Sequence, residues 1–249
     1  SGFALSGVIA GAPDFGVLTQ TEMLEAIRRI CRATSLPVFA DADTGYGGPL
    51  EARRTIELWE EAGVAALHLE DQLAPKKCGH FAGKNVIPTT EMVEKLRAMV
   101  DARRDPDFFI VARTDAIAVE GIDAAIERLA AYADTGVDGL YADAPESRED
   151  MKKLSEALGH LGLPILFNMA RSGKSPVLTM QEAADLGFAY SLCPIESMLT
   201  AHKAVTQMMR TFLAQPTTEA IADGLTPFDD FNRFIGLHEM AELNRRYGA

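Results

Sequence analysis

The segment EDQLAPKKCGHFAGK, from Glu70 to Lys84, places a cysteine among basic residues directly after a run that ends in carboxylates. The basic neighbours of Cys78 are Lys76, Lys77 and His80. Positive charges around a thiol favour the thiolate, or tune the thiol as a proton donor to a developing carbanion. A buried apolar cysteine is the weaker interpretation, because the surroundings are polar and the glycines indicate a loop. The segment therefore predicts that Cys78 is catalytic.

A second group of candidate residues lies in ADADTGYGG, from Ala40 to Gly48. Asp41 and Asp43 alternate along an expected strand and therefore point to the same side, while the following glycines let the loop approach a ligand. Carboxylates without neighbouring His or Cys ligands suit Mg2+ or Mn2+. Glu70 ends the next expected strand, and three acids this close together repel one another without a cation. The pattern predicts a divalent metal site, with capping of the next helix as the alternative.

Two further polar residues end apolar runs. Arg113, in VARTDA, would be costly to bury unpaired, so it needs an acidic partner or an anionic ligand. A structural ion pair with Asp115 or Asp143 is an alternative of equal weight. Asn168, in LPILFNM, is a candidate hydrogen-bond donor to a substrate oxygen, or else it satisfies the backbone of its own loop. The histidines without such a pattern, which we interpret as ordinary core or surface residues, are His68, His160, His202 and His238.

These residues need elements that bring them together, and the chain alternates two kinds of pattern. Seven short apolar runs, rich in β-branched and aromatic residues, have the composition of strands covered on both faces. They span residues 3–9, 36–43, 64–71, 107–115, 137–143, 163–169 and 187–193. The segments between them have helical spacing, and several begin with Thr or Asp, as helix N-caps do, and end at Gly. The alternation predicts parallel βα units.

The positions of the candidate residues decide between a closed barrel and an open sheet. They lie at the carboxyl ends of five expected strands, and only a barrel gathers that many strand ends around one point. We therefore predict an α/β fold, a (β/α)8 TIM-type barrel that forms a single domain over residues 1–249. Seven runs are one short of eight, so we expect an N-terminal βα unit to be missing from the given chain. Residues from about 214 onward predict a C-terminal helical extension that packs on a neighbouring subunit.

Composition restricts the class of partner. The chain has 36 acidic and 24 basic residues and a formal net charge of -12, which argues against nucleic acid and anionic membranes as partners. No apolar run reaches the roughly 18 residues of a membrane span. Three widely spaced cysteines indicate neither a disulfide framework nor a CxxC zinc site, and favour a reducing compartment. We expect an enzyme for small molecules in the cytoplasm, or in the mitochondrial matrix if the source is a eukaryote.

Four motifs in this order, DADTGYGG, LHLEDQ, KKCGH and ARTDA, resemble the isocitrate lyase and phosphoenolpyruvate (PEP) mutase superfamily, and more closely its small lyase branch. The resemblance covers most of the chain, from Leu5 to Phe212. It implies a (β/α)8 barrel with Mg2+ and a homotetramer of paired dimers that exchange a C-terminal helix. The implied activity is Mg2+-dependent cleavage of a carbon-carbon bond in a small anionic carboxylate. The substrate would be a 2-hydroxy or 2-oxo di- or tricarboxylate of the 2-methylisocitrate or dimethylmalate type.

The resemblance also implies a role for each motif residue. The implied catalytic residues are Cys78, His80, Arg113 and Lys76. The implied Mg2+ ligands, direct or through water, are Asp41, Asp43 and Glu70, with Asp14 as a supporting acid. The implied substrate contacts are Ser6, Gly7, Gly79, Asn168, Asp143 and Ser191. The loop around Cys78 would close over the substrate, and Cys78 would protonate the enolate-type product.

Departures from the family pattern leave more than one activity open. Asp143 stands where the family usually has Glu, and the pair Ala170 and Arg171 reverses a charge near the site. The tyrosine expected just before Ser6 is absent, so the general base is not identified. Ser191 stands where methylisocitrate lyases usually have Pro, and a serine there resembles the oxaloacetate hydrolases, which give oxalate and acetate. A phosphonopyruvate mutase or hydrolase, which KKCGH disfavours, and a non-catalytic metabolite-binding barrel also stay open.

Overall fold

The structure is a computed structural model that describes residues 1–79, 81–171 and 173–248. The chain divides into two compact units, Ser1–Glu196 and Ser197–Ala249. No helix in the described part of the chain combines the length and the apolar character needed to cross a membrane.

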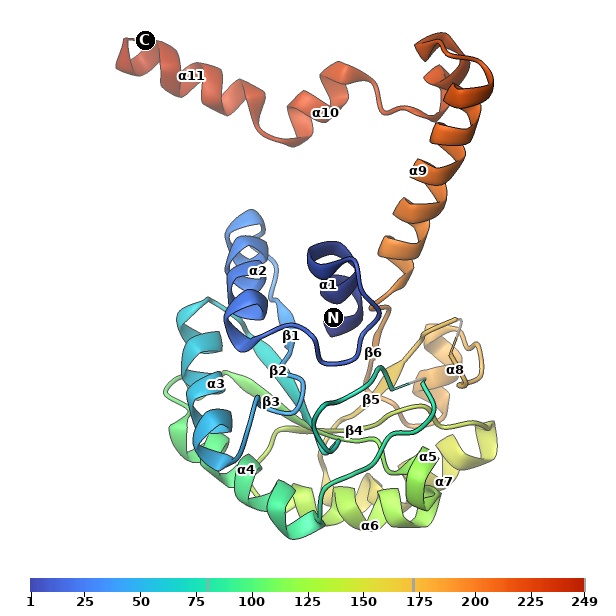
Figure 1. Cartoon of the computed structure of the whole chain (residues 1–249). Helices are drawn as coiled ribbons and strands as arrows, with labels where there is room; N and C mark the ends of the chain where they lie inside the picture. The colour runs from blue at the N-terminus through green and yellow to red at the C-terminus, as the bar shows by residue number, and fades with distance from the viewer. Residues whose placement is uncertain (80, 172, 249) are drawn as a thin grey trace. The chain divides into compact units, whose positions relative to one another are not determined.

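The first unit is built on six parallel strands that curl into a half-barrel (Figure 1). The strands are β1 (Phe39–Asp41), β2 (Ala66–Glu70), β3 (Phe109–Thr114), β4 (Gly139–Ala142), β5 (Ile165–Asn168) and β6 (Tyr190–Leu192). They lie in the sheet in the order of the sequence, and each neighbouring pair is parallel. The α/β class and the parallel sheet predicted from the alternating pattern are thereby confirmed, with six strands in place of the expected seven.

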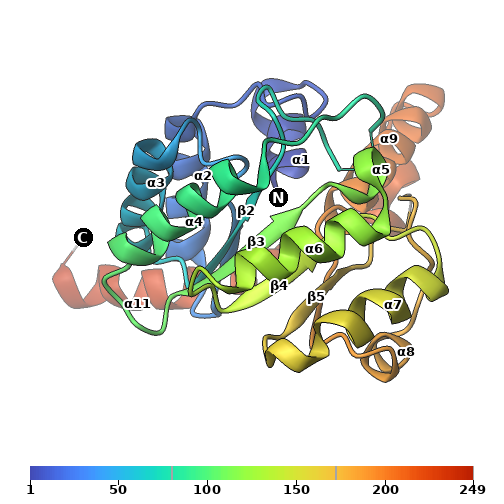
Figure 2. The same cartoon turned by 90° about the horizontal axis from the view of Figure 1, so that it is seen from below.

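Helices cover the outer face of the sheet, and those that follow β1 connect successive strands (Figure 2). The longer ones are α2 (Gln20–Ala33), α3 (Pro49–Glu61), α4 (Thr89–Ala102), α6 (Ile122–Ala133), α7 (Arg148–Leu158) and α8 (Met180–Asp185). The short elements are α1 (Gly2–Leu5), η1 (Ser6–Ala10), α5 (Ile117–Glu120) and η2 (Gly159–Leu161). Thr19 and Thr179 form capping boxes at the starts of α2 and α8, and Ser147 caps α7. These hydroxyls satisfy amide donors that the first turn leaves unpaired.

Alternate residues of the strands face two different cores. Leu67, Ile110 and Phe167 belong to the main core between the sheet and its helices. Val111, Tyr141 and Leu166 belong to a smaller cluster on the inner face, together with the partly buried Phe39, Phe109, Tyr190 and Leu192. Side chains two positions apart share a face of a strand, so each strand carries apolar inner residues below its carboxyl end. Polar residues two positions further along project from the same face at the end of the strand.

Residues 3–9 are helical, and the prediction of a strand there is wrong. Residues 2–5 form α1, and residues 6–10 form the π-helical turn η1. The Ser1 side chain accepts a hydrogen bond from the Ala4 amide, and the Gly2 amide donates to Asp41 Oδ2 at 2.7 Å. Among the described residues no strand pairs with this segment. Periodicity alone does not separate a short apolar strand from a short helix.

The second unit contains α9 (Glu196–Ala214), which begins at the last residue of the first unit, η3 (Thr218–Gly224), α10 (Phe228–Phe234) and α11 (Leu237–Tyr247). These elements bury none of their described residues. The large apolar side chains left exposed in α10 and α11 are Phe228, Phe231, Phe234, Leu237, Met240, Leu243 and Tyr247. The unit therefore does not cover its own apolar surface.

Candidate active site

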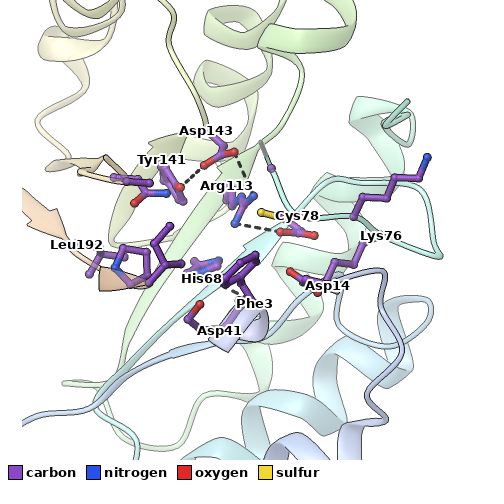
Figure 3. A pocket seen from close by; sticks show the side chains of 18 residues that line it. Phe3, Asp14, Asp41, His68, Lys76, Cys78, Arg113, Tyr141, Asp143 and Leu192 are labelled. Carbon is purple, nitrogen blue, oxygen red and sulfur yellow. Dashed lines mark hydrogen bonds and ion pairs between the residues drawn. The ribbon is translucent and has the colours of Figure 1, made fainter. Parts of the chain in front are cut away.

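A pocket opens at the carboxyl ends of the strands, where inward-facing polar side chains from β1 to β5 meet the loop that carries Cys78 (Figure 3). The predicted site residues that line it are Asp14, Asp41, Glu70, Lys76, Cys78, Gly79, Arg113, Asp143 and Asn168. They come from distant parts of the sequence and meet because parallel strands place their carboxyl ends at one edge of the sheet. His80 lies outside the described residues.

Four other predicted residues do not line this pocket: Ser6, Gly7, Asp43 and Ser191. Ser6 is buried, and its hydroxyl donates to the carbonyls of Ala12 at 3.0 Å and Pro13 at 3.3 Å. Gly7 is exposed. Leu192 turns toward the pocket, so its neighbour Ser191 points to the other side of β6. Asp43 contacts Lys76, which does line the pocket.

Asp14, Asp41, Asp43 and Glu70 form an acidic cluster around the Lys76 ammonium. Lys76 Nζ lies 2.7 Å from Asp43 Oδ1 and 2.9 Å from Asp14 Oδ2, and all three side chains are buried. β1 ends at Asp41, and Asp43 has a left-handed backbone with φ of 46°, so the prediction that both acids alternate along the strand is wrong. The Asp43 amide donates to Asp41 Oδ1 at 3.0 Å, which brings the two carboxylates together all the same.

Burial and mutual repulsion shift the pKa values of these groups. Burial, followed by the charge of Asp41, raises the pKa of Asp43 to about 6. Burial would also raise the pKa of Asp41, but His68 and the cations Lys76 and Arg113 hold it well below its ordinary value. Burial alone would lower the pKa of Lys76, but the surrounding acids, Asp43 and Glu70 first, raise it strongly. The cluster thus favours a cation at its centre.

The acidic cluster has the donor set of a hard metal ion. Glu70 Oε1 is buried and has no hydrogen-bond partner among the described residues. As they stand, no three His, Cys, Asp or Glu side chains in the described ranges are grouped to hold a metal ion. The Lys76 ammonium lies against two of the carboxylates, those of Asp14 and Asp43. The residues fit a divalent cation in chemical type, and such a cation would compete with Lys76 for them.

Arg113 contacts Glu70 of the acidic cluster and also the acids on the other side of the pocket. Its guanidinium lies 3.1 Å from Glu70, binds Asp115 through Nε at 2.8 Å and Nη2 at 3.0 Å, and lies 3.4 Å from Asp143. It also lies over the Tyr141 ring, 5.1 Å from the centroid. The predicted structural ion pairs are therefore present, and the same side chain faces the pocket. Acids on three sides fix the guanidinium, so it is oriented before any anion arrives.

The loop that carries Cys78 is docked onto these residues. A bridge between Gln72 and Val86 closes its base. The Cys78 amide donates to the Asp14 carbonyl at 3.0 Å. Gly79 packs so closely on Asp143 that a Cβ there would lie 1.7 Å from Asp143 Oδ2. Half-buried Cys78 is thereby held over the pocket between the acidic cluster and Arg113.

His68 and Tyr141 line the pocket, although His68 was expected to be an ordinary histidine and Tyr141 was not singled out. The His68 ring lies between Phe39 and Tyr141, with centroids 5.6 and 5.8 Å away, and its Nε2 is 3.7 Å from Asp41 Oδ1. Burial lowers the pKa of His68 to about 4, so the ring is neutral at pH 7. The Tyr141 hydroxyl donates to Asp143. Each lies two positions before a predicted acid, and side chains two positions apart share a face of a strand. This alternation would have placed both residues at the site.

The pair Ser1 and Gly2 takes the place expected for Ser6 and Gly7. Ser1 lines the pocket, and a Cβ on Gly2 would lie 2.9 Å from both Asp43 Oδ1 and Lys76 Nζ, so only glycine fits there. The dipeptide Ser-Gly occurs at both places, so the sequence alone does not show which of the two lies at the strand ends. The pocket also has apolar lining residues, namely Phe3, Ala170, Leu192, Pro194 and Ile195.

Comparisons with known proteins agree on one family. The family described as phosphoenolpyruvate phosphomutase matches residues 1–213. The chain is 39% identical over 250 residues to 2,3-dimethylmalate lyase of Eubacterium barkeri, with 100% of this chain and 85% of that protein covered. It is 44% identical over 212 residues to probable 2-methylisocitrate lyase 2 of Corynebacterium glutamicum, with 84% and 68% covered.

Two solved structures extend this comparison. Oxaloacetate acetylhydrolase in complex with the inhibitor 3,3-difluorooxalacetate has 32% sequence identity and a TM-score of 0.92, and the match covers 100% of this chain and 84% of that one. Phosphonopyruvate hydrolase in complex with oxalate and Mg2+ has 25% identity and a TM-score of 0.88, with 99% and 85% covered. Each of these two structures holds a small dicarboxylate anion.

Proposed function

The chain belongs to the lyase branch of the PEP mutase/isocitrate lyase superfamily, and on this premise we propose that it cleaves a carbon-carbon bond in a small 2-hydroxy or 2-oxo di- or tricarboxylate. The favoured substrates are of the 2-methylisocitrate or 2,3-dimethylmalate type. One observation carries the proposal: Cys78 and Gly79 line the same pocket as Arg113, Asp41 and Glu70. Cleavage beside a hydroxyl produces the enolate of a carboxylic acid, which needs nearby positive charge and a proton donor. The pocket contains both.

The described side chains suit three tasks in this reaction. Arg113 is fixed by its acids and would bind a substrate carboxylate through the guanidinium edge that faces the pocket. Asn168 Oδ1 is buried and lacks a hydrogen-bond partner within the described part of the chain, so it would accept a hydrogen bond from a substrate hydroxyl. The Cys78 thiol would then give its proton to the carbon that loses its partner. The docked loop would keep water from competing for that carbon.

We propose that Mg2+, or Mn2+, binds the acidic cluster. Asp41, Asp43 and Glu70 would hold it directly or through water, with Asp14 as a supporting acid, since these carboxylates converge and already surround one positive charge. When bound, the ion would stabilise negative charge on the oxygens of the oxo-acid half of the substrate. The similar phosphonopyruvate hydrolase was solved with Mg2+.

Hydrolysis of oxaloacetate to oxalate and acetate is the second candidate. It is favoured by the similarity to oxaloacetate acetylhydrolase over the full chain. The serine that suggested this activity from the sequence, Ser191, does not line the pocket, which is why we rank the lyase reaction first. Phosphonopyruvate chemistry ranks third, because Cys78 occupies the loop position at which the mutases carry a different residue.

We also propose a closed barrel and a helix-exchanged assembly. The six parallel strands would form part of a (β/α)8 barrel, in keeping with the TM-score of 0.92 to a solved family member. The exposed aromatic residues of α10 and α11 would pack against a second copy of the chain, so that dimers exchange C-terminal helices and pair as a homotetramer. Light scattering on the purified chain measures this state, and a monomer at micromolar concentration would contradict it.

The test of function is a product assay with and without Mg2+ on 2-methylisocitrate, 2,3-dimethylmalate, isocitrate and oxaloacetate. Release of pyruvate, propionate or glyoxylate supports the lyase, and oxalate from oxaloacetate supports the second candidate. Cys78→Ser should lower turnover by about a hundredfold or more, because the hydroxyl is a far weaker acid than the thiol. Cys31→Ser, on α2 and away from the pocket, is the matched control and should be fully active. Equal turnover by Cys78→Ser and the control would remove Cys78 from the mechanism.

A further inference from the structure

Lys84 is a buried lysine in the loop that the proposed mechanism does not use. Its side chain is 1% exposed. Its ammonium donates to the carbonyl of Gly79, the residue after Cys78, and to Asp115 Oδ1 at 3.0 Å. A buried ammonium is costly unless its donors are satisfied, so its two partners fix where Lys84 lies. The lysine thereby connects the loop to the end of β3.

Asp115 is the point where this connection meets the pocket. Its carboxylate is fully buried and also accepts both hydrogen bonds from Arg113, at 2.8 and 3.0 Å. Its own amide donates to Asp71 Oδ1 at 2.9 Å, and the Tyr132 hydroxyl donates to Asp71 Oδ2 at 2.8 Å. One anchored carboxylate thus holds the substrate-facing guanidinium on one side and the loop lysine on the other.

The backbone on the other side of Cys78 is held as well. Gln72, at the base of the loop, accepts a hydrogen bond from the Lys77 amide at 2.9 Å and donates one to the Lys77 carbonyl at 2.8 Å. The carbonyls immediately before and after Cys78 therefore both accept a hydrogen bond from a buried side chain. Of the two contacts, only the one from Lys84 leads on to Arg113.

We propose that Lys84 is a positioning residue that couples the docking of the Cys78 loop to the Arg113 subsite through Asp115. The part of this inference that concerns catalysis rests on the proposed function, in which Cys78 donates a proton. A buried ion pair by itself is weak evidence of a contribution to stability, because desolvation offsets the attraction. The specific consequence of the Lys84 contacts is the placement of the Gly79 carbonyl, and with it the Cys78 thiol.

The first test measures loop docking without any substrate. Lys84→Met keeps an unbranched apolar side chain out to Cε and removes the ammonium. We expect alkylation of Cys78 by iodoacetamide, followed by peptide mass spectrometry, to become about ten- to a hundredfold faster, the range for loss of a hydrogen bond to a charged group. Alkylation of Cys31 reports global unfolding and should not change. Lys95→Met is the matched control, because Lys95 is also buried but lies on α4 outside the loop.

An unchanged Cys78 rate in Lys84→Met, relative to the control, would overturn the proposal. If Cys31 accelerates together with Cys78, the variant has lost its fold, and Lys84→Gln becomes the test, because its neutral amide can still donate to the Gly79 carbonyl but cannot form the ion pair with Asp115 that the coupling requires. A Cys78 rate in Lys84→Gln between those of wild type and a denatured sample, with Cys31 unchanged, supports the positioning role. A wild-type rate for both cysteines overturns it.

The second test uses turnover. In Lys84→Met, kcat should fall by about tenfold or more, with a smaller change in KM, since the proton donor is misplaced while most substrate contacts remain. An equal loss of kcat in Lys84→Met and Lys95→Met would mean that removing any buried lysine lowers kcat by destabilising the fold, and it would contradict the proposal. The alkylation result does not depend on which reaction is catalysed, so failure of the proposed function and failure of the positioning role are distinguishable.

Discussion

Replacing Gly79 by alanine should separate loop docking from folding. A Cβ on Gly79 would lie 1.7 Å from Asp143 Oδ2 and 2.7 Å from Arg113 Nη2, whereas real Cβ atoms essentially never approach closer than 3.0 Å. Asp143 cannot move aside easily, because its side chain is 1% exposed and accepts from Tyr141 while lying beside Arg113. The loop must therefore retreat by roughly 1 Å or more, and a displacement of that size costs about a hundredfold in rate.

The assay for Gly79→Ala combines kcat and KM with urea unfolding. We expect kcat to fall by about a hundredfold. The free energy of unfolding should change by less than about 1 kcal/mol, because the retreating loop leaves the main core intact. Gly159→Ala is the control, since a Cβ there meets no atom within 4 Å. Turnover of Gly79→Ala within twofold of the control would refute the docked geometry as the active one.

Three further predictions concern the electrostatics. The pKa of His68 is lowered from 6.5 to about 4, so the unfolded chain takes up its proton first and stability falls as pH falls between those values. In urea titrations from pH 7 to 4, the free energy of unfolding of the wild type should fall by about 3 kcal/mol more than that of His68→Phe. The same pH dependence in both proteins would contradict this prediction. Arg128→Met should lower the free energy of unfolding by about 3 kcal/mol, because buried Asp71 loses one of its partners. Glu120→Gln, which removes the more exposed partner of Arg128, should lower it by less than about 1 kcal/mol in the same urea titration. Lys76→Met should lower the free energy of unfolding by about 3 kcal/mol or more in EDTA, and millimolar Mg2+ should restore part of it if the acidic cluster binds the ion; no effect of Mg2+ would count against that site.

The sheet could be predicted because its strands have a simple local signature. Apolar runs with β-branched residues, separated by capped helices, identify β1 to β6, and each observed strand lies inside its predicted run. The run at residues 3–9 has the same composition but becomes α1 and η1. The segment also makes a tertiary contact, from the Gly2 amide to Asp41, which no local pattern contains.

The site could be predicted where strand ends determined it. Asp41 and Glu70 end their strands, Arg113 is the last but one residue of β3, and all three line the pocket as expected. Residues outside the strands were placed less well, because their contacts depend on how loops fold back. The resemblance implied Ser6, whereas Ser1 lines the pocket, and His68 was passed over although it shares a face with Glu70. The family and the lyase class predicted from the four motifs are confirmed by the relatives.

The loop segment KKCG, residues 76–79, contacts both the acidic cluster and the Arg113 side of the pocket. Lys76 brings a positive charge to the acidic cluster, the Cys78 amide binds the Asp14 carbonyl, and Gly79 packs on Asp143 beside Arg113. Each contact restrains the others, because planar peptide bonds fix the distance between successive Cα atoms, so adjacent residues move together. A change in the charge of the acidic cluster, such as the arrival of a divalent cation, would therefore act first on Lys76 and through it on Cys78. In the proposed function, binding of the cation and placement of the Cys78 thiol would therefore be coupled through this loop.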